Sequence, residues 1–171
     1  MILRKAEISD IDPICRIIGE AQAQMARLGI DQWQNGYPAR ATIEADTLSG
    51  VGVVLCSKEE REVVAYCAAI FGSEPTYARI DDGEWLTSGD DYVVVHRLAV
   101  ADRFKHQGVA THFMRLIEAL ATKRGCGSFR IDSHRDNGYM HALCARLGFV
   151  RCGVIYVSDG SARVAYEKVL R

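Results

Sequence analysis

The residues best suited to chemistry form a short basic turn after an apolar run. The run Tyr92–Val100 (YVVVHRLAV) is followed by ADRFKHQGVATHF and then by apolar residues at helical spacing. A β-branched run predicts a strand buried on both faces. The first N–H groups of the next helix lack partners and carry the positive end of its dipole. Gly108 and Ala110 lack bulk, and Arg103 and Lys105 supply charge, so the segment predicts a phosphate site. An ordinary turn with solvated basic residues is the alternative.

Other phosphate and metal motifs do not occur. The chain has no G-x-x-x-x-G-K-[ST] sequence, and Gly125–Arg130 begins like G-x-G-x-x-G but ends in Arg and enters a predicted strand. None of the six cysteines has C-x-x-C spacing or a nearby H-x-x-x-H. We therefore expect reduced thiols, no disulfide framework and no metal.

Composition sets the class of protein. The 171 residues are 49% apolar and 25% charged, which predicts one globular domain over residues 1–171. With 21 basic and 22 acidic residues, the net charge of −1 argues against a general nucleic-acid or membrane binder. No apolar run is long enough to span a bilayer, and the first residues do not resemble a signal peptide. We expect a soluble, cytoplasmic protein.

The periodicity places the basic turn within an α+β fold. Seven strands are predicted, at residues 2–6, 51–56, 62–71, 92–100, 128–134, 149–157 and 162–170. Four helices are predicted, at residues 10–28 (capped by Ser9 or Asp10), 39–49, 107–124 and 137–147. Residues 72–91 have no clear period and predict a long functional loop. The order implies a single mixed, mostly antiparallel central sheet of about seven strands, with helices on both faces.

Two motifs resemble a known family. Lys105–Ala110 (KHQGVA) resembles the [Gln/Arg]-x-x-Gly-x-[Gly/Ala] signature of the GNAT superfamily of acetyl-CoA-dependent N-acetyltransferases. Asn137–Phe149 resembles the second motif of that family, in which an Asn precedes Leu-Tyr-(x)3-Gly-Phe. Together the motifs cover roughly residues 92–150. The resemblance implies an acyl-CoA N-acyltransferase-like fold with acetyl-CoA as cosubstrate.

The resemblance also implies roles for single residues. Leu98, Ala99 and Val100 would pair with the pantetheine arm like an added strand. Asn137 would hydrogen-bond the pantetheine, and Leu143 would lie near the thioester sulfur. The phosphates would be held by the turn and the helix start, at Lys105, His106, Gln107, Gly108, Val109, Ala110 and Thr111.

Two positions depart from the family pattern. Lys105 stands where the family has Gln or Arg, which keeps a charge but loses the planar fork. Cys144 stands where many members have a Tyr that protonates the departing thiolate. A thiol can donate a proton, but an inert packed cysteine is the alternative. Tyr139 and Tyr156 are further candidates, so the general acid stays unassigned.

Transfer to an amine also needs a base and an acceptor site. His96, in the central strand, is the best-placed titratable residue, and a satisfied core histidine is the alternative. Trp33, Tyr37 and Trp85 lie in loops where aromatics can line a pocket or form a satellite cluster. Residues 74–91 hold six acids and one base, which favours a cationic acceptor by steering. The acceptor would be the amine of a small molecule, amino acid or peptide, and a solvated acidic loop is the alternative.

Three functions are compatible with these residues. The first is an N-acetyltransferase in which the amine attacks the thioester directly. The second is an acyl-CoA-binding sensor that has lost catalysis, and the third is a nucleotide-binding protein of another type. A homodimer through the C-terminal strand pair is a further expectation, which rests on analogy with the fold.

Overall fold

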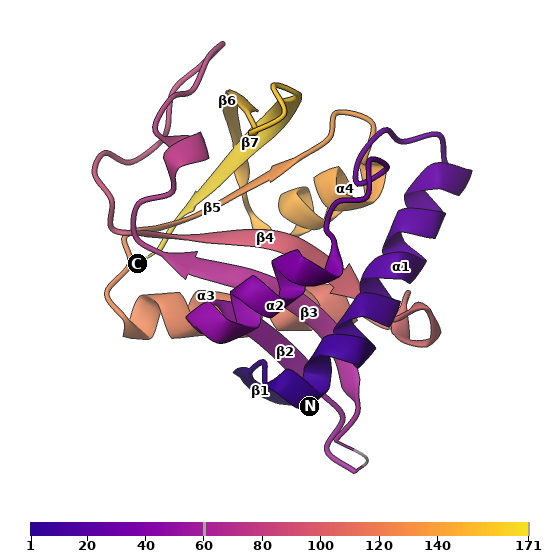
Figure 1. Cartoon of the computed structure of the whole chain (residues 1–171). Helices are drawn as coiled ribbons and strands as arrows, with labels where there is room; N and C mark the ends of the chain where they lie inside the picture. Colours follow the sequence, from indigo (N-terminus) through magenta and orange to yellow (C-terminus); the bar gives the residue numbers. More distant parts are fainter. Residues whose placement is uncertain (60, 171) are drawn as a thin grey trace. The chain divides into compact units, whose positions relative to one another are not determined.

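The computed structural model describes residues 1–59 and 61–170, and Figure 1 shows the arrangement of its elements. Its seven strands form one mixed sheet in the order β1-β2-β3-β4-β5-β7-β6. The strands are β1 (Ile2–Lys5), β2 (Gly52–Cys56), β3 (Val63–Phe71), β4 (Tyr92–Val100), β5 (Ser128–Ser133), β6 (Val150–Tyr156) and β7 (Ala162–Val169). The α-helices are α1 (Ile11–Arg27), α2 (Arg40–Ser49), α3 (Val109–Lys123) and α4 (Gly138–Leu147). The predicted fold class is confirmed, since all but one of the strand pairings given are antiparallel.

Most predicted boundaries agree with the structure to within one or two residues. β4 has the predicted bounds, and α4 ends at Gly148, whose φ of 81° is left-handed and favours glycine. The predicted helix cap is only partly right. Asp10 occupies the N-cap position of α1 but does not cap it, because its carboxylate accepts from Arg4 at 2.6 and 2.9 Å and from the Glu7 amide at 2.8 Å.

The chain divides into two compact units. The first comprises Met1–Ala69 with Arg97–Leu116, and the second comprises Ile70–His96 with Ile117–Arg171. In the first unit, β1, β2 and β3 pair antiparallel, and α1 and α2 pack on them (Figure 1). The core of this unit includes Ile14, Ile43, Val54 and Tyr66, all fully buried. The 3.6-residue spacing of the apolar residues in α1 builds this face.

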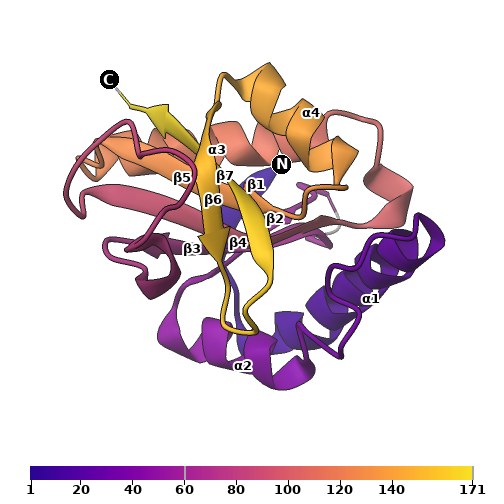
Figure 2. The same ribbon diagram turned by 90° about the horizontal axis from the view of Figure 1, so that it is seen from above.

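In the second unit, β6 and β7 form an antiparallel hairpin beside β5 (Figure 2). β4 and β5 run parallel, and their register covers only Tyr92–Val94 against Ser128–Arg130. β5 nevertheless continues to Ser133, where it still pairs with β7. Its last three residues therefore pair on the β7 side alone within this unit.

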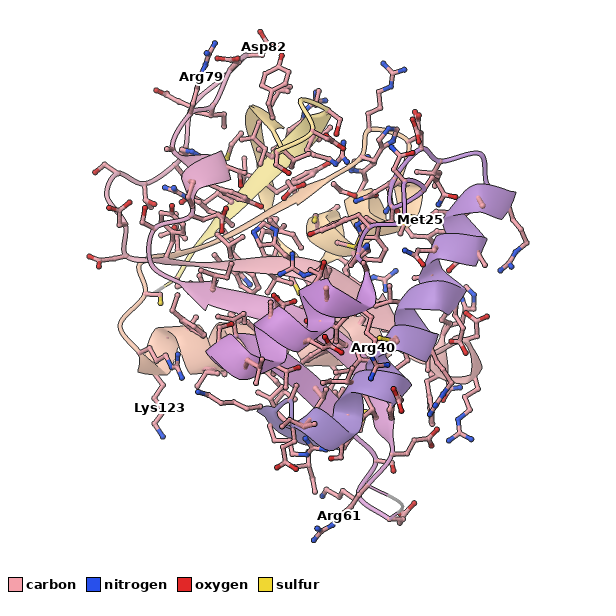
Figure 3. The ribbon with its side chains drawn as sticks, viewed as in Figure 1. Met25, Arg40, Arg61, Arg79, Asp82 and Lys123 are labelled. Carbon is pink, nitrogen blue, oxygen red and sulfur yellow. The ribbon has the colours of Figure 1, made fainter. Side chains whose placement is uncertain are left out.

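Residues 72–91, here named the strap, are packed more closely than a free loop. Their 3-10 turn, Pro75–Tyr77, buries Tyr77 in a core with Tyr92, Val94, Ile155 and Ala165. Further along, Asp81 forms an antiparallel bridge with Val154 of the edge strand β6. The N–H of each residue donates to the carbonyl of the other, and both hydrogen bonds are 2.8 Å long. A Cβ on Gly83 would lie 1.9 Å from the Cys152 carbonyl oxygen, and one on Gly153 would lie 2.5 Å from that of Asp81. Only glycines allow this approach. Arg79 and Asp82 lie at the outer tip of the strap (Figure 3).

The cysteines agree with the prediction, because all six are free thiols. Among the described helices, none is both long and apolar enough to cross a membrane.

Candidate active site

The connection from β4 to α3 has the geometry of an anion cradle. A 3-10 turn, Asp102–Phe104, leads into His106 and Gly108, both left-handed with φ of 61° and 77°. α3 begins at Val109, and its first bond in this turn runs from the His112 amide to the Gly108 carbonyl at 3.0 Å. The N–H groups just before His112 have no carbonyl within the helix to bind. A Cβ on Gly108 would meet nothing within 4 Å, so space is open above these groups. The fit to a phosphate is therefore good.

The basic residues of this turn are engaged within the protein. The Lys105 ammonium donates to Gln24 Oε1 at 2.6 Å and to Asp102 Oδ1 at 2.5 Å, and its side chain is only 19% exposed. Arg103 pairs with Glu62 and lies 4.7 Å over the Phe104 ring. The cradle is thus formed by backbone, and Lys105 braces it against α1.

His96 lies between two carboxylates in the second unit. Its Nε2 is 3.5 Å from Glu74 Oε2, and its Nδ1 is 3.9 Å from Asp132 Oδ1. Its side chain is 17% exposed, so the ring is partly accessible. The His96 ring and the hydrogen bonds from Thr76 hold the pKa of Glu74 at about 2, against the effect of burial. In the described part of the chain, no group of three or more His, Cys, Asp or Glu is arranged to hold a metal ion.

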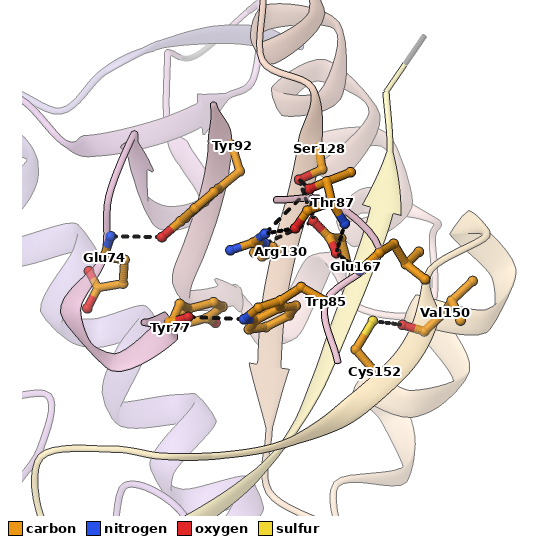
Figure 4. A network of polar contacts seen from close by, with 11 residues as sticks. Glu74, Tyr77, Trp85, Thr87, Tyr92, Ser128, Arg130, Val150, Cys152 and Glu167 are labelled. Carbon is orange, nitrogen blue, oxygen red and sulfur yellow. Dashed lines mark hydrogen bonds and ion pairs between the residues drawn. The ribbon is translucent and has the colours of Figure 1, made fainter. Parts of the chain in front are cut away.

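Tyr77 packs beside His96, and Trp85 packs on Tyr77. The Tyr77 hydroxyl donates to Asp132 Oδ1 at 2.6 Å, and its ring meets that of His96 edge-on at 5.8 Å. Trp85 stacks on Tyr77 with ring centroids 5.4 Å apart, and its indole N–H donates to the Tyr77 carbonyl (Figure 4). The predicted substrate residue Trp85 is therefore a packed, half-buried member of the strap.

A buried ion pair fixes the strap. Arg130 Nε donates to Glu167 Oε1 at 2.9 Å, with both side chains almost fully buried (Figure 4). Thr87 donates to the same carboxylate through its hydroxyl at 2.6 Å, and Ser128 donates at 2.5 Å. Burial raises the pKa of Glu167, but these hydrogen bonds outweigh it and leave the pKa below its usual value. This network ties the strap to β5 and β7.

The second motif forms α4 and its cap. The Asn137 side-chain oxygen accepts from the Met140 amide at 3.2 Å, as an N-cap residue does. Leu143 and Cys144 are buried, whereas Tyr139 is 58% exposed. Burial raises the pKa of the Cys144 thiol to about 12, which does not favour proton donation. Tyr166 of β7 also bonds α4, through its hydroxyl to His141 Nδ1 at 2.7 Å.

Arg97 interrupts the regular geometry of β4. Its φ is 57°, and residues 96–98 are the only half-buried residues of this otherwise buried strand. Leu98 is one of these three, whereas Ala99 and Val100 are buried. Arg97 donates to Asp46 of α2 and to the hydroxyl of Tyr37, the latter at 2.6 Å. The predicted acceptor residue Tyr37 is thus held in place while 45% exposed, and Trp33 packs against the core of the first unit.

The sequence did not reveal the partners of His96. Glu74 and Asp132 lie 22 and 36 positions away, in the strap and in β5. Their acidic type was visible, but nothing local indicated that they would converge. Nothing in the sequence indicated the left-handed backbone of Arg97 either, because arginine seldom adopts that conformation.

Residues 22–149 match the model of the acetyltransferase (GNAT) family. A search of the curated proteins found no match.

Solved structures of acetyltransferases resemble the chain over almost its full length. An acetyltransferase of the GNAT family from Streptococcus agalactiae is 35% identical, with a TM-score of 0.89 over 99% of this chain and 95% of that one. The PaiA N-acetyltransferase of Thermoplasma acidophilum, solved with coenzyme A, is 13% identical, with a TM-score of 0.70 over 98% of both chains. The ribosomal-protein-S18-alanine N-acetyltransferase of Escherichia coli is 15% identical, with a TM-score of 0.65 over 99% of this chain and 93% of that one. The latter two share the fold.

Proposed function

Because the chain belongs to the GNAT family of acetyltransferases, we propose that it transfers an acetyl group from acetyl-CoA to a primary amine. The amine nitrogen attacks the thioester carbonyl directly, a C–N bond forms, and the C–S bond breaks to release the coenzyme A thiolate. No covalent enzyme intermediate is needed, because a thioester is already activated. We also propose that the two units form one domain, since the family match includes residues of both.

The β4–α3 connection carries this proposal. The backbone of residues 107–111 would bind the pyrophosphate, with Gly108 leaving the space open. Lys105 and His106 would shape the turn, and residues 98–100 would present backbone groups to the pantetheine. Asn137 and Leu143 would contact the pantetheine from α4. In the PaiA structure coenzyme A is present, which supports this class of ligand.

His96 would act as the base. Its partial exposure lets a substrate amine or a bridging water reach the ring. As His96 takes up the amine proton, the carboxylates of Glu74 and Asp132 would stabilise the imidazolium. Backbone N–H groups at the half-buried part of β4 would polarise the thioester carbonyl.

The departing thiolate requires a proton donor. Of the three predicted candidates, Tyr139 on the first turn of α4 and Tyr156 at the end of β6 are exposed, whereas the Cys144 thiol is buried with a raised pKa. Tyr139 is two residues from Asn137, which would contact the pantetheine. We therefore propose Tyr139 as the acid, reprotonated by solvent, and assign Cys144 to packing.

The acceptor is proposed to be a cationic amine of a small molecule, amino acid or peptide. The strap carries Asp82, Glu84, Asp90 and Asp91 exposed to solvent, so its field attracts cations. Tyr37 is the proposed contact in the first unit. Trp85 and Trp33 would act by supporting the loops, because both pack inward.

A thiol-release assay tests the function. Acetyl-CoA is incubated with the protein and a panel of amines, and free coenzyme A is titrated as it forms. Turnover with amines supports the transferase, whereas preference for acidic or neutral acceptors would contradict the cationic site. Saturable coenzyme A binding with no turnover on any amine favours the acyl-CoA sensor. Binding of ATP but not of coenzyme A favours the third function, a nucleotide-binding protein of another type.

Location and assembly are part of the proposal. A cytoplasmic protein suits six free thiols. A homodimer through the C-terminal strand pair, β6 and β7, stays a prediction, and sedimentation velocity would measure it.

A further inference from the structure

Two side chains of α1 hold the turn between β4 and α3. The Glu20 carboxylate accepts from the Asp102 amide at 2.7 Å, and the Gln24 side-chain oxygen accepts from the Lys105 ammonium at 2.6 Å. Lys105 also donates to the Asp102 carboxylate, so the two contacts meet at one end of the turn. All four residues belong to the first unit. The turn is therefore fixed by residues 82 and 81 positions away in the sequence.

The helix that carries these contacts is itself anchored in a core. Ile14, Ile17 and Ile18 of α1 are at most 4% exposed and belong to the core of the first unit. Glu20 and Gln24 are one helical turn apart, so both side chains leave the same side of the helix. Both are half-buried. Half-buried side chains on a packed helix have little freedom left to lose, so these contacts restrict the turn.

The turn needs support of this kind. His106 and Gly108 are both left-handed, with φ of 61° and 77°. A left-handed backbone is uncommon for a residue that carries a Cβ, such as His106, and it persists where the surroundings hold it. The proposed phosphate donors are backbone N–H groups, whose directions change with the conformation of the turn. Side chains that fix the turn therefore also fix the directions of these donors.

We propose that Glu20 and Gln24 are positioning residues for the cofactor, which hold the β4–α3 turn in its phosphate-binding conformation. The inference rests on the proposed function, in which this turn binds the pyrophosphate of acetyl-CoA. Gln24 acts through the Lys105 ammonium, and Glu20 acts through the Asp102 amide. The measured affinity falls with the fraction of molecules whose turn has the binding conformation, so loss of either contact weakens binding.

A direct contact between Lys105 and a phosphate is the competing explanation, because ammonium groups bind phosphates. In that case Gln24 holds the ammonium away from the ligand, and removal of the Gln24 side-chain oxygen would release Lys105 and tighten binding. Under the proposal the same change weakens binding. The two explanations therefore predict effects of opposite sign.

The first test is a double-mutant cycle of Gln24→Met and Lys105→Met, followed by calorimetric titration of coenzyme A. Methionine has a similar length to both side chains but lacks their polar groups. We expect Gln24→Met to weaken binding about 3- to 10-fold, the effect of one hydrogen bond. In the Lys105→Met background it should have no further effect, because its partner is gone. Unchanged or tighter binding in Gln24→Met, or an equal effect in both backgrounds, would overturn the proposal.

A truncated ligand locates the effect. 3′-Phospho-ADP has the phosphates of coenzyme A but no pantetheine, so Gln24→Met should weaken the binding of both ligands by the same factor. A loss seen with coenzyme A alone would place the effect outside the turn and contradict the proposal. If the wild type binds neither ligand, the proposed function itself fails, and that result is distinct from a failure at Gln24.

Two variants of Glu20 separate its contact from its charge. Glu20→Gln keeps an oxygen that can accept from the Asp102 amide, whereas Glu20→Met does not. We expect Glu20→Gln to bind coenzyme A as the wild type does, and Glu20→Met to bind about 3- to 10-fold more weakly. Equal affinities in the two variants would show that the contact has no effect on binding.

Gln22→Met is the control on the same helix. Gln22 is two residues from both Glu20 and Gln24 and therefore lies on the opposite side of α1. Its side-chain amide donates to the carbonyls of Tyr37 and Pro38 at 3.1 and 3.4 Å. This variant also loses contacts of α1 but should keep the wild-type affinity for coenzyme A. If it weakens binding as much as Gln24→Met does, the cause is a general loosening of α1, and the proposal is wrong.

Discussion

Arg97 holds Asp46 through two parallel hydrogen bonds, Nε to Oδ2 and Nη2 to Oδ1, each 2.8 Å long. The side chains are 11% and 9% exposed, and the Tyr66 hydroxyl donates to the same carboxylate. Burial and the adjacent Asp46 raise the pKa of Tyr66, which keeps it a donor. This pair fixes the left-handed residue of β4 to α2 and, through Tyr37, to the loop at residues 29–38.

Replacing Asp46 should destabilise the protein strongly. Asp46→Asn leaves the Arg97 guanidinium buried without its counter-charge, a change that typically costs about 3–5 kcal/mol. Urea unfolding followed by circular dichroism measures the loss. The matched control is Asp12→Asn, because Asp12 forms a similarly short pair with Arg40 on the surface, at 2.6 Å, with the Asp12 side chain 70% and the Arg40 side chain 57% exposed. Water and salt screen that exposed pair, so its loss should leave the free energy of unfolding nearly unchanged. If the two variants lose the same free energy of unfolding, burial does not determine how much an ion pair contributes to stability.

Coenzyme A binding should depend on the absence of a side chain at residue 108. Gly108→Val places a branched side chain in the open space above the start of α3, and we expect binding to fall at least 100-fold. Gly160→Val is the control, since Gly160 has nearly the same φ, 80° against 77°, and equally open surroundings in the β6–β7 turn. The control carries the same backbone strain and should bind normally. Retained binding in Gly108→Val would refute the phosphate site.

Loss of the base should lower turnover and leave cofactor binding intact. For His96→Gln we expect kcat to fall about 10²- to 10⁴-fold, the usual contribution of general-base catalysis. Calorimetric titration of the same variant should give the wild-type affinity for coenzyme A. If the kcat of His96→Gln equals that of the wild type, His96 is a core histidine and not the base.

Glu74 should make stability depend on pH in the acid range. Its pKa is about 2 in the folded protein and about 4.3 in an unfolded chain, so its charged form favours folding. That contribution is complete above the unfolded value and is lost as the pH falls towards the folded value. The difference in unfolding free energy between the wild type and Glu74→Gln should therefore shrink from about pH 5 to about pH 2. Urea titrations at several pH values measure it, and a constant difference would exclude the linkage.

Local patterns predicted the sheet and its helices but not the strap. Tyr92–Val100 was identified from its β-branched run, and α4 from its periodicity and terminal glycine. These signals are local because each element buries a face with its own period. The strap has no period, since Thr87 is fixed by Glu167, 80 residues away.

The candidate site was predictable where backbone defines it. Gly108 and the start of α3 can be recognised from residue type, because only a small residue suits that turn. Lys105 has the expected type but a different role, as Gln24 and Asp102 engage its ammonium. The environment of His96 depends on convergence of three segments, which no single window of sequence contains.

The close approach of Gly83 and Gly153 has a consequence for assembly. An exposed edge strand recruits strands from other molecules and promotes aggregation. Here the bridge from Asp81 uses both backbone groups of Val154, so the chain supplies its own partner at the middle of β6. A second copy cannot extend the sheet across that point unless the strap detaches. A side chain larger than hydrogen at residue 83 or 153 would push the strap away from β6. The edge of β6 would then be open, and further copies of the chain could add to the sheet there.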